Sequence, residues 1–275
     1  MAAGWAAAEP PPARFWPLRR EQWLLLLCLL ALSGLAWLAL LRLTNTMTAP
    51  GGMADVAMAG MPMPWDLRDA LLMLAMWLVM MVGMMLPSAI PMLLMYQLML
   101  RKRLPNAQRH WAVALFCLAY VLVWGGFSLF ATLLQWGLER LLPLSPQLLN
   151  VPPGLELGNS STLAAGLLLA AGTYQLLPTK SACLERCRGP LQFLLAYWRP
   201  GWRGGWRMGL AHGCYCLGCC WLLMGLLFVG GLMNLLWAAL LGGYILLEKT
   251  LPGGPWFSRL AGLLLLGWGS GLLLL

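Results

Sequence analysis

Seven apolar runs, each near the roughly 20 residues that a membrane-spanning helix needs, divide the chain. They lie at 22–41, 70–99, 111–138, 161–177, 206–230, 232–249 and 256–275. The pattern predicts an all-α fold, a polytopic transmembrane helix bundle of about seven spans. The second run contains Pro87 and Pro91, so we expect a kinked helix there. Pro87 cannot donate to the Gly83 carbonyl, nor Pro91 to that of Pro87, and such carbonyls must meet a cavity or a neighbouring helix.

The polar segments between the runs suggest one transmembrane domain with few additions. We expect a cytoplasmic tail at 1–21 and a helical domain at 22–275. That domain would carry a Met-rich external loop at 42–69 and a basic, Cys-containing cytoplasmic loop at 178–205. The first apolar core, Trp23 to Leu41, is longer than the apolar part of a signal peptide and no small-residue cleavage site follows it. We therefore expect a retained helix.

The Lys and Arg residues fall unequally on the two sides of the predicted bundle. With the N-terminus inside, fifteen of the eighteen are cytoplasmic and only Arg42, Arg68 and Arg140 are external. This positive-inside bias predicts that the N-terminus is in and the C-terminus is out. We expect the basic residues to form a solvated cytoplasmic rim facing anionic lipid headgroups. The net charge of +9 therefore does not indicate nucleic-acid binding.

The composition supports a membrane protein and gives little support to catalysis. With 61% hydrophobic and 10% charged residues, the chain cannot cover a soluble surface, so the lipid bilayer is its expected environment. The sequence has no glycine-rich phosphate loop, and no paired carboxylates or nucleophile–base arrangement at membrane depth. We expect no enzyme activity, apart from one thiol-based alternative below.

The most unusual stretch, HGCYCLGCC at 212–220, places one histidine and four cysteines inside an apolar run. At 100° per residue, four of these side chains share about one third of a helix circumference, and Cys214 points almost the opposite way. The four are His212, Cys216, Cys219 and Cys220. One cysteine in a membrane helix is an ordinary small apolar residue. A cluster of soft ligands on one face indicates metal binding.

A second pair, Cys183 and Cys187, lies in the basic segment KSACLERCRGP. Their spacing of four places both thiols on one side of a helical turn, where they could share a metal. We expect Lys180, Arg186 and Arg188 to lower the pKa of both thiols and favour thiolate. Two ordinary surface cysteines remain the alternative.

Methionines extend the soft-ligand pattern outward. Five lie in the external loop, at positions 47, 53, 58, 61 and 63, and others follow helical spacing in the second run. Of the helical set, Met80, Met84 and Met85 are the candidate ligands, although such residues often only pack. Thioethers are poor zinc ligands and suit Cu(I). Copper as Cu(I) is therefore the expected metal, with zinc possible on the Cys/His cluster.

Three stretches together resemble the DUF2182 family, which is described as predicted metal-binding integral membrane proteins of bacteria. They are 76–96, 174–190 and 212–237, followed by LEKTLP at 247–252. The family pattern falls on Met84, Met85 and Pro87, on Tyr174, Gln175, Cys183, Cys187 and Arg188, on Cys216, Cys219, Cys220 and Trp221, and on Glu248 and Lys249. Cys214 stands outside it. The resemblance implies a metal-binding protein of the bacterial inner membrane.

Three functions follow from these patterns. The first is acquisition, transfer or transport of Cu(I), which implies a metallochaperone or membrane partner. The second is a membrane thiol-disulfide oxidoreductase that uses the C-x-x-C pair Cys216 and Cys219. The third is a membrane assembly scaffold whose cysteines only pack. In any of them, we expect Glu248 and Lys249 to form an interfacial ion pair.

Overall fold

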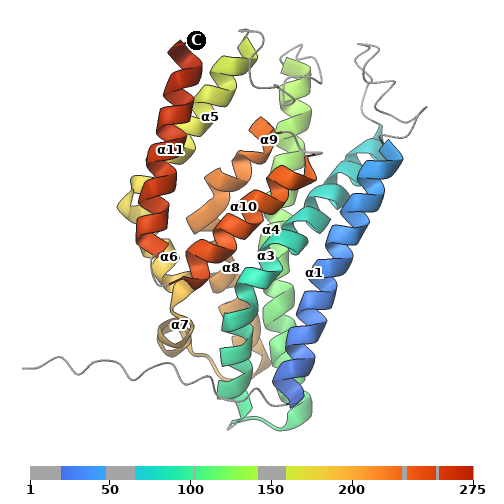
Figure 1. The fold of residues 1–275 in the computed structure, drawn as a ribbon. Helices are drawn as coiled ribbons and strands as arrows, with labels where there is room; N and C mark the ends of the chain where they lie inside the picture. Colours follow the sequence, from blue (N-terminus) through green and yellow to red (C-terminus); the bar gives the residue numbers. More distant parts are fainter. Residues whose placement is uncertain are drawn as a thin grey trace, which may run out of the picture.

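The computed structural model describes residues 20–47, 66–101, 103–141, 159–230, 234–251 and 254–274. These residues form helices joined by short connections, without a strand among them (Figure 1). The helices are α1 (Arg20–Met47), α3 (Leu67–Arg101), α4 (Asn106–Leu141), α5 (Asn159–Leu176), α6 (Pro178–Arg188), α7 (Pro190–Tyr197), α8 (Gly201–Gly225), α9 (Leu227–Gly230), α10 (Leu235–Thr250) and α11 (Gly254–Leu274).

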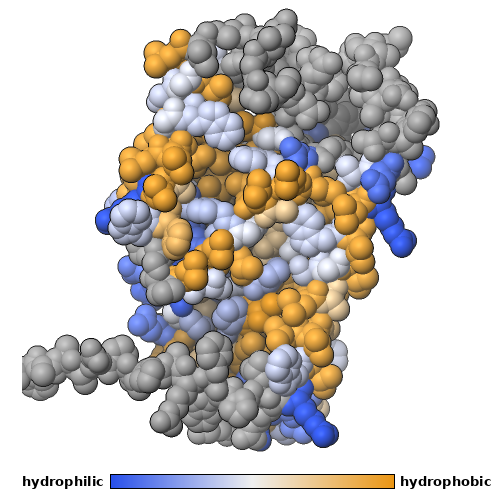
Figure 2. Space-filling view, in the orientation of Figure 1, coloured by the Kyte–Doolittle hydropathy of each residue, from blue (hydrophilic) through white to orange (hydrophobic). Residues whose placement is uncertain are grey.

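The described residues of the seven predicted apolar runs are almost all helical, with the run at 206–230 divided between α8 and α9, so the all-α class is confirmed. Five of these segments are long and apolar enough to cross a membrane, in α1, α3, α4, α8 with α9, and α11. The apolar part of α5 (Thr162–Leu176) and the 16-residue α10 are shorter. The count of seven spans therefore stays a prediction. Figure 2 shows apolar side chains over much of the visible face of the bundle.

The segment expected as a basic loop, 178–205, consists of α6, α7 and the start of α8. Pro178 and Pro190 stand at the first positions of α6 and α7, where a missing N–H costs no hydrogen bond. The expected external methionines at 53, 58, 61 and 63 lie outside the described residues.

Helix α3 keeps both prolines inside it and changes direction along its length (Figure 1). Pro87 leaves the Gly83 carbonyl without its usual intrahelical donor. The Ser33 hydroxyl of α1 donates to this oxygen at 2.8 Å. A freed carbonyl therefore meets a neighbouring helix, as the sequence predicted, and the bond ties α1 to α3.

Three of the basic residues expected on a solvated rim are buried instead: Arg109, Lys180 and Lys249. That part of the prediction is wrong, because each of the three has found a partner inside the bundle. The Arg109 side chain is 2% exposed, and its Nη2 lies 2.6 Å from a carboxylate oxygen of Glu21, which joins α4 to α1. Lys180 and Lys249 belong to the site described below.

Helices α4 and α8 pack closely through three glycines at a spacing of four. A Cβ at Gly205 or Gly209 would meet the backbone carbonyl oxygen of Ala112 or Phe116, and a Cβ at Gly213 would lie 2.8 Å from Val123 Cγ2. Small residues at this spacing let two helix backbones approach. The approach brings the buried face of α8 within reach of aromatic side chains on α4.

We predict that Gly209→Ala destabilises the bundle by about 1–3 kcal/mol, because the added methyl overpacks the α4–α8 contact. Thermal unfolding in detergent, followed by tryptophan fluorescence, measures the change. Gly126→Ala on α4 is the matched control, since nothing lies within 4 Å of a Cβ there. Equal melting temperatures for the two variants would contradict the packing argument.

Candidate metal site

One face of α8 turns its soft ligands into the bundle. His212, Cys216, Cys219 and Cys220 are buried, and Cys214 is exposed. This division confirms the helical arrangement predicted from the spacing. The buried histidine and cysteines of α8 therefore face α4, α6 and α10.

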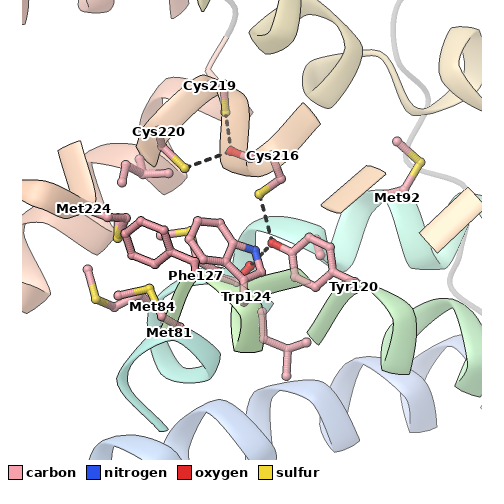
Figure 3. Close-up of a cluster of buried hydrophobic side chains, with 14 of the residues drawn as sticks. Met81, Met84, Met92, Tyr120, Trp124, Phe127, Cys216, Cys219, Cys220 and Met224 are labelled. Carbon is pink, nitrogen blue, oxygen red and sulfur yellow. Dashed lines mark hydrogen bonds between the residues drawn. The ribbon is translucent and has the colours of Figure 1, made fainter. Parts of the chain in front are cut away.

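Cys216 is the centre of the polar contacts on this face (Figure 3). Its sulfur lies 2.9 Å from Lys249 Nζ of α10 and 3.0 Å from the Tyr120 hydroxyl of α4. That hydroxyl also lies 3.0 Å from the Met85 carbonyl oxygen, to which the Ser88 hydroxyl donates at 2.8 Å. Tyr120 and Ser88 thus both donate to the Met85 carbonyl oxygen beside the Cys216 sulfur.

Cys219 and Cys220 direct their thiols back along their own helix. Both donate to the Cys216 carbonyl oxygen, at 3.1 and 2.9 Å (Figure 3). In this arrangement no group of three His, Cys, Asp or Glu side chains is placed to hold a metal ion within the described part of the chain. Rotation about the Cα–Cβ bonds would release both sulfurs from the carbonyl.

Helix α6 brings a second set of thiols to α8. Cys183 and Cys187 are partly buried and pack against the core that contains Cys216, Cys219 and Cys220. The Cys183 sulfur lies against Gly218, 3.1 Å from where a Cβ on that glycine would stand. Thiols separated by some thirty residues in the sequence therefore face one another across two helices.

The electrostatic expectation for this second pair is wrong at both cysteines, because the pKa of each thiol is raised and not lowered. Burial raises the pKa of the Cys183 thiol, with a smaller effect from Cys219, and interaction with the Cys216 thiol raises that of Cys187. The expected effect of Lys180 is absent because its ammonium turns away from the cysteines to Glu248.

His212 lies one turn before Cys216 in an aromatic enclosure. Its ring stacks on Tyr120 at 5.5 Å between centroids and meets the edge or face of Phe193 and Phe116 at 5.5 and 5.9 Å. The Nδ1 atom is buried and has no hydrogen-bond partner among the described residues. An imidazole nitrogen held in this way can accept a metal ion.

The three candidate methionines are buried in the same core as the cysteines. Met80, Met84 and Met85 pack there with Met81, Met92 and Met224. In the view of Figure 3, Met81 and Met84 lie near Met224 beside Trp124 and Phe127, and Met92 lies apart from them. Met84 also contacts α10, because a Cβ on Gly242 would stand 3.3 Å from its Cγ. The candidate methionines and the buried cysteines thus belong to one core cluster.

The expected ion pair between Glu248 and Lys249 is wrong. Neighbouring residues on a helix project about 100° apart, so these two reach different helices. Glu248 forms an ion pair with Lys180 of α6, and both side chains are almost fully buried. Ser258 and Tyr244 donate to the same carboxylate oxygen. Lys249 instead contacts Cys216 on α8.

Comparison with known families identifies the group to which this arrangement belongs. A family described as PpoB2, copper chaperone, matches residues 74–272, which include most of α3 and all of α6, α8 and α10. The chain belongs to this family. No curated protein and no solved structure matches the chain. Membership in a copper-chaperone family agrees with the copper expectation and favours it over zinc.

Sequence reasoning did not predict that Tyr120 and Lys249 contact Cys216. Tyr120 gave no signal, since it is a single tyrosine in an apolar run. Lys249 did give a signal, because an ionisable residue in an apolar helix indicates a functional role. Its position near the end of the apolar run, however, is also typical of an interfacial residue.

We predict that Glu248→Gln lowers the free energy of unfolding by about 3–5 kcal/mol, because it leaves the Lys180 ammonium buried without a carboxylate. Unfolding in mixed detergent micelles measures the loss. Joint replacement by Lys180→Met and Glu248→Leu should recover part of it. The matched control is Glu185→Gln, an exposed carboxylate on α6. A Glu248 variant as stable as this control would show that the pair contributes nothing.

Proposed function

We propose that the protein is a multispan membrane copper chaperone that binds Cu(I) as cargo and passes it to a partner. Its cargo site comprises the thiols of Cys187, Cys216, Cys219 and Cys220, with His212 one turn away. The observation that carries the proposal is the packing of the α6 cysteines against the apolar core that contains the α8 thiols. The bundle would cross the bacterial inner membrane seven times with its N-terminus in the cytoplasm.

The donor set suits Cu(I) better than harder ions. Thiolate and thioether sulfur are the ligands that Cu(I) prefers, and the surrounding methionines add more of them. An apolar core with little water also disfavours hydrated competitors.

A chaperone must release its cargo as well as bind it. Cys219 and Cys220 have an alternative partner for their thiols in the Cys216 carbonyl oxygen. Release of a metal would therefore leave these thiols hydrogen-bonded, which lowers the cost of an empty site. The same two side chains could exchange between carbonyl and metal by rotation alone, without movement of the helix.

Burial makes the thiol-disulfide alternative less favourable. Cys216 and Cys219 are 1% and 0% exposed, so a thiol on a protein substrate has no path to either sulfur. Both cysteines are free in the structure. A small ion can reach a site from which a polypeptide is excluded, and this difference favours metal cargo.

We predict that Cys216→Ser or Cys187→Ser weakens Cu(I) binding by more than the ~10–100-fold that changes to outer-shell partners typically cost. Competition with a chromophoric Cu(I) chelator, on reduced protein in detergent, measures the affinity. Cys214→Ser is the matched control because Cys214 lies on the same helix and faces away from the site.

Wild-type affinity in the Cys214 variant is expected. A Cu(I) affinity equal to that of the wild type in the Cys216 and Cys187 variants would show that these thiols do not belong to the cargo site. Stoichiometric zinc in the reduced wild-type protein, with no Cu(I) binding, would overturn the choice of metal.

A further inference from the structure

Lys249 carries a positive charge into the bundle where no carboxylate receives it. Its side chain is 7% exposed, and its ammonium contacts the Cys216 sulfur at 2.9 Å and the Ser88 hydroxyl at 3.3 Å. The neighbouring carboxylate, Glu248, is occupied by Lys180. Among the described residues, the only ion pairs are that one and the pair between Arg109 and Glu21. The group that faces the Lys249 ammonium is therefore the Cys216 sulfur.

A buried charge in an apolar medium requires a partner of opposite sign. Copper bound as Cu(I) by two thiolates carries one net negative charge, and a single ammonium at hydrogen-bonding distance balances it. The cation in this core matches that charge in number and position. A neutral side chain at the same place would leave the copper–thiolate group uncompensated.

We propose that Lys249 is the built-in counter-cation of the copper site and the positioning residue for Cys216. This proposal rests on the proposed function. A thiolate sulfur has several lone pairs, so it can bind the metal and accept the Lys249 N–H at the same time. Ser88 gives the ammonium a second fixed contact, which holds it over the sulfur whether or not copper is bound.

The position of Lys249 on α10 fixes the direction from which its side chain approaches Cys216. Glu248, one residue earlier, fixes α10 to α6 through Lys180. Lys249 therefore starts from a helix that is already anchored, and it reaches the α8 thiol from a defined direction. Outer-shell partners that orient a ligand in this way usually change metal affinity about 10–100-fold when they are replaced.

The test compares three variants at this position for Cu(I) affinity by chelator competition. Lys249→Met removes charge and donor, Lys249→Gln keeps a donor without charge, and Lys249→Arg keeps both. We expect affinity to fall about 10–100-fold in the Met and Gln variants and to be largely retained in the Arg variant. Each substitution is repeated with Cys216→Ser, where the effect of Lys249 should disappear.

Size-exclusion profiles and melting temperatures separate folding defects from binding defects, and the charge-transfer absorption of the copper–thiolate group reports the site directly. Silver(I) serves as a second, redox-stable probe. If the wild type binds Cu(I) and Lys249→Gln binds it equally or more tightly, the counter-cation proposal is wrong and the proposed cargo function is unaffected. If all three variants fold normally and lose Cu(I) affinity, the shape of the lysine side chain and not its charge is required, which contradicts the proposal. A wild-type protein that binds no Cu(I) would overturn both.

Discussion

The arrangement of the site depends on two buried charges that follow one another on a single helix. Glu248 and Lys249 cannot share a partner, because consecutive helical side chains diverge by about 100°. Each must nevertheless be compensated inside an apolar bundle. Glu248 therefore binds Lys180 on α6 and Lys249 contacts Cys216 on α8. One dipeptide thus fixes both thiol-bearing helices against α10.

Close packing between α4 and α8 supplies the remaining partner. Without side chains at Gly205 and Gly209, the two backbones approach until the Tyr120 hydroxyl reaches the Cys216 sulfur. The hydroxyl and the Lys249 ammonium then contact the same atom from different helices. A sulfur contacted from two helices in this way has a defined position, which is the preorganisation that a specific site requires.

The periodic features of the chain were predictable from the sequence, and its pairings were not. Apolar runs gave the helices, and helical geometry separated Cys214 from Cys216 correctly, because both depend only on local spacing. The partner of Glu248 depends on which helices meet, so a neighbour in sequence was mistaken for a neighbour in space. Lys180 was misplaced for the same reason, since a basic residue in a polar segment resembles a surface residue until its carboxylate partner is known.

A cargo site differs from a structural metal site in how its metal-free form is stabilised. A structural site leaves its ligands unsatisfied without the metal, so metal loss is costly. Here the metal-free thiols have other partners: Cys219 and Cys220 bond to a carbonyl oxygen, and Cys216 contacts Lys249 and Tyr120. In the proposed function, those contacts would reduce the difference in free energy between the loaded and empty states. Transfer of copper to a partner would need that difference to be small.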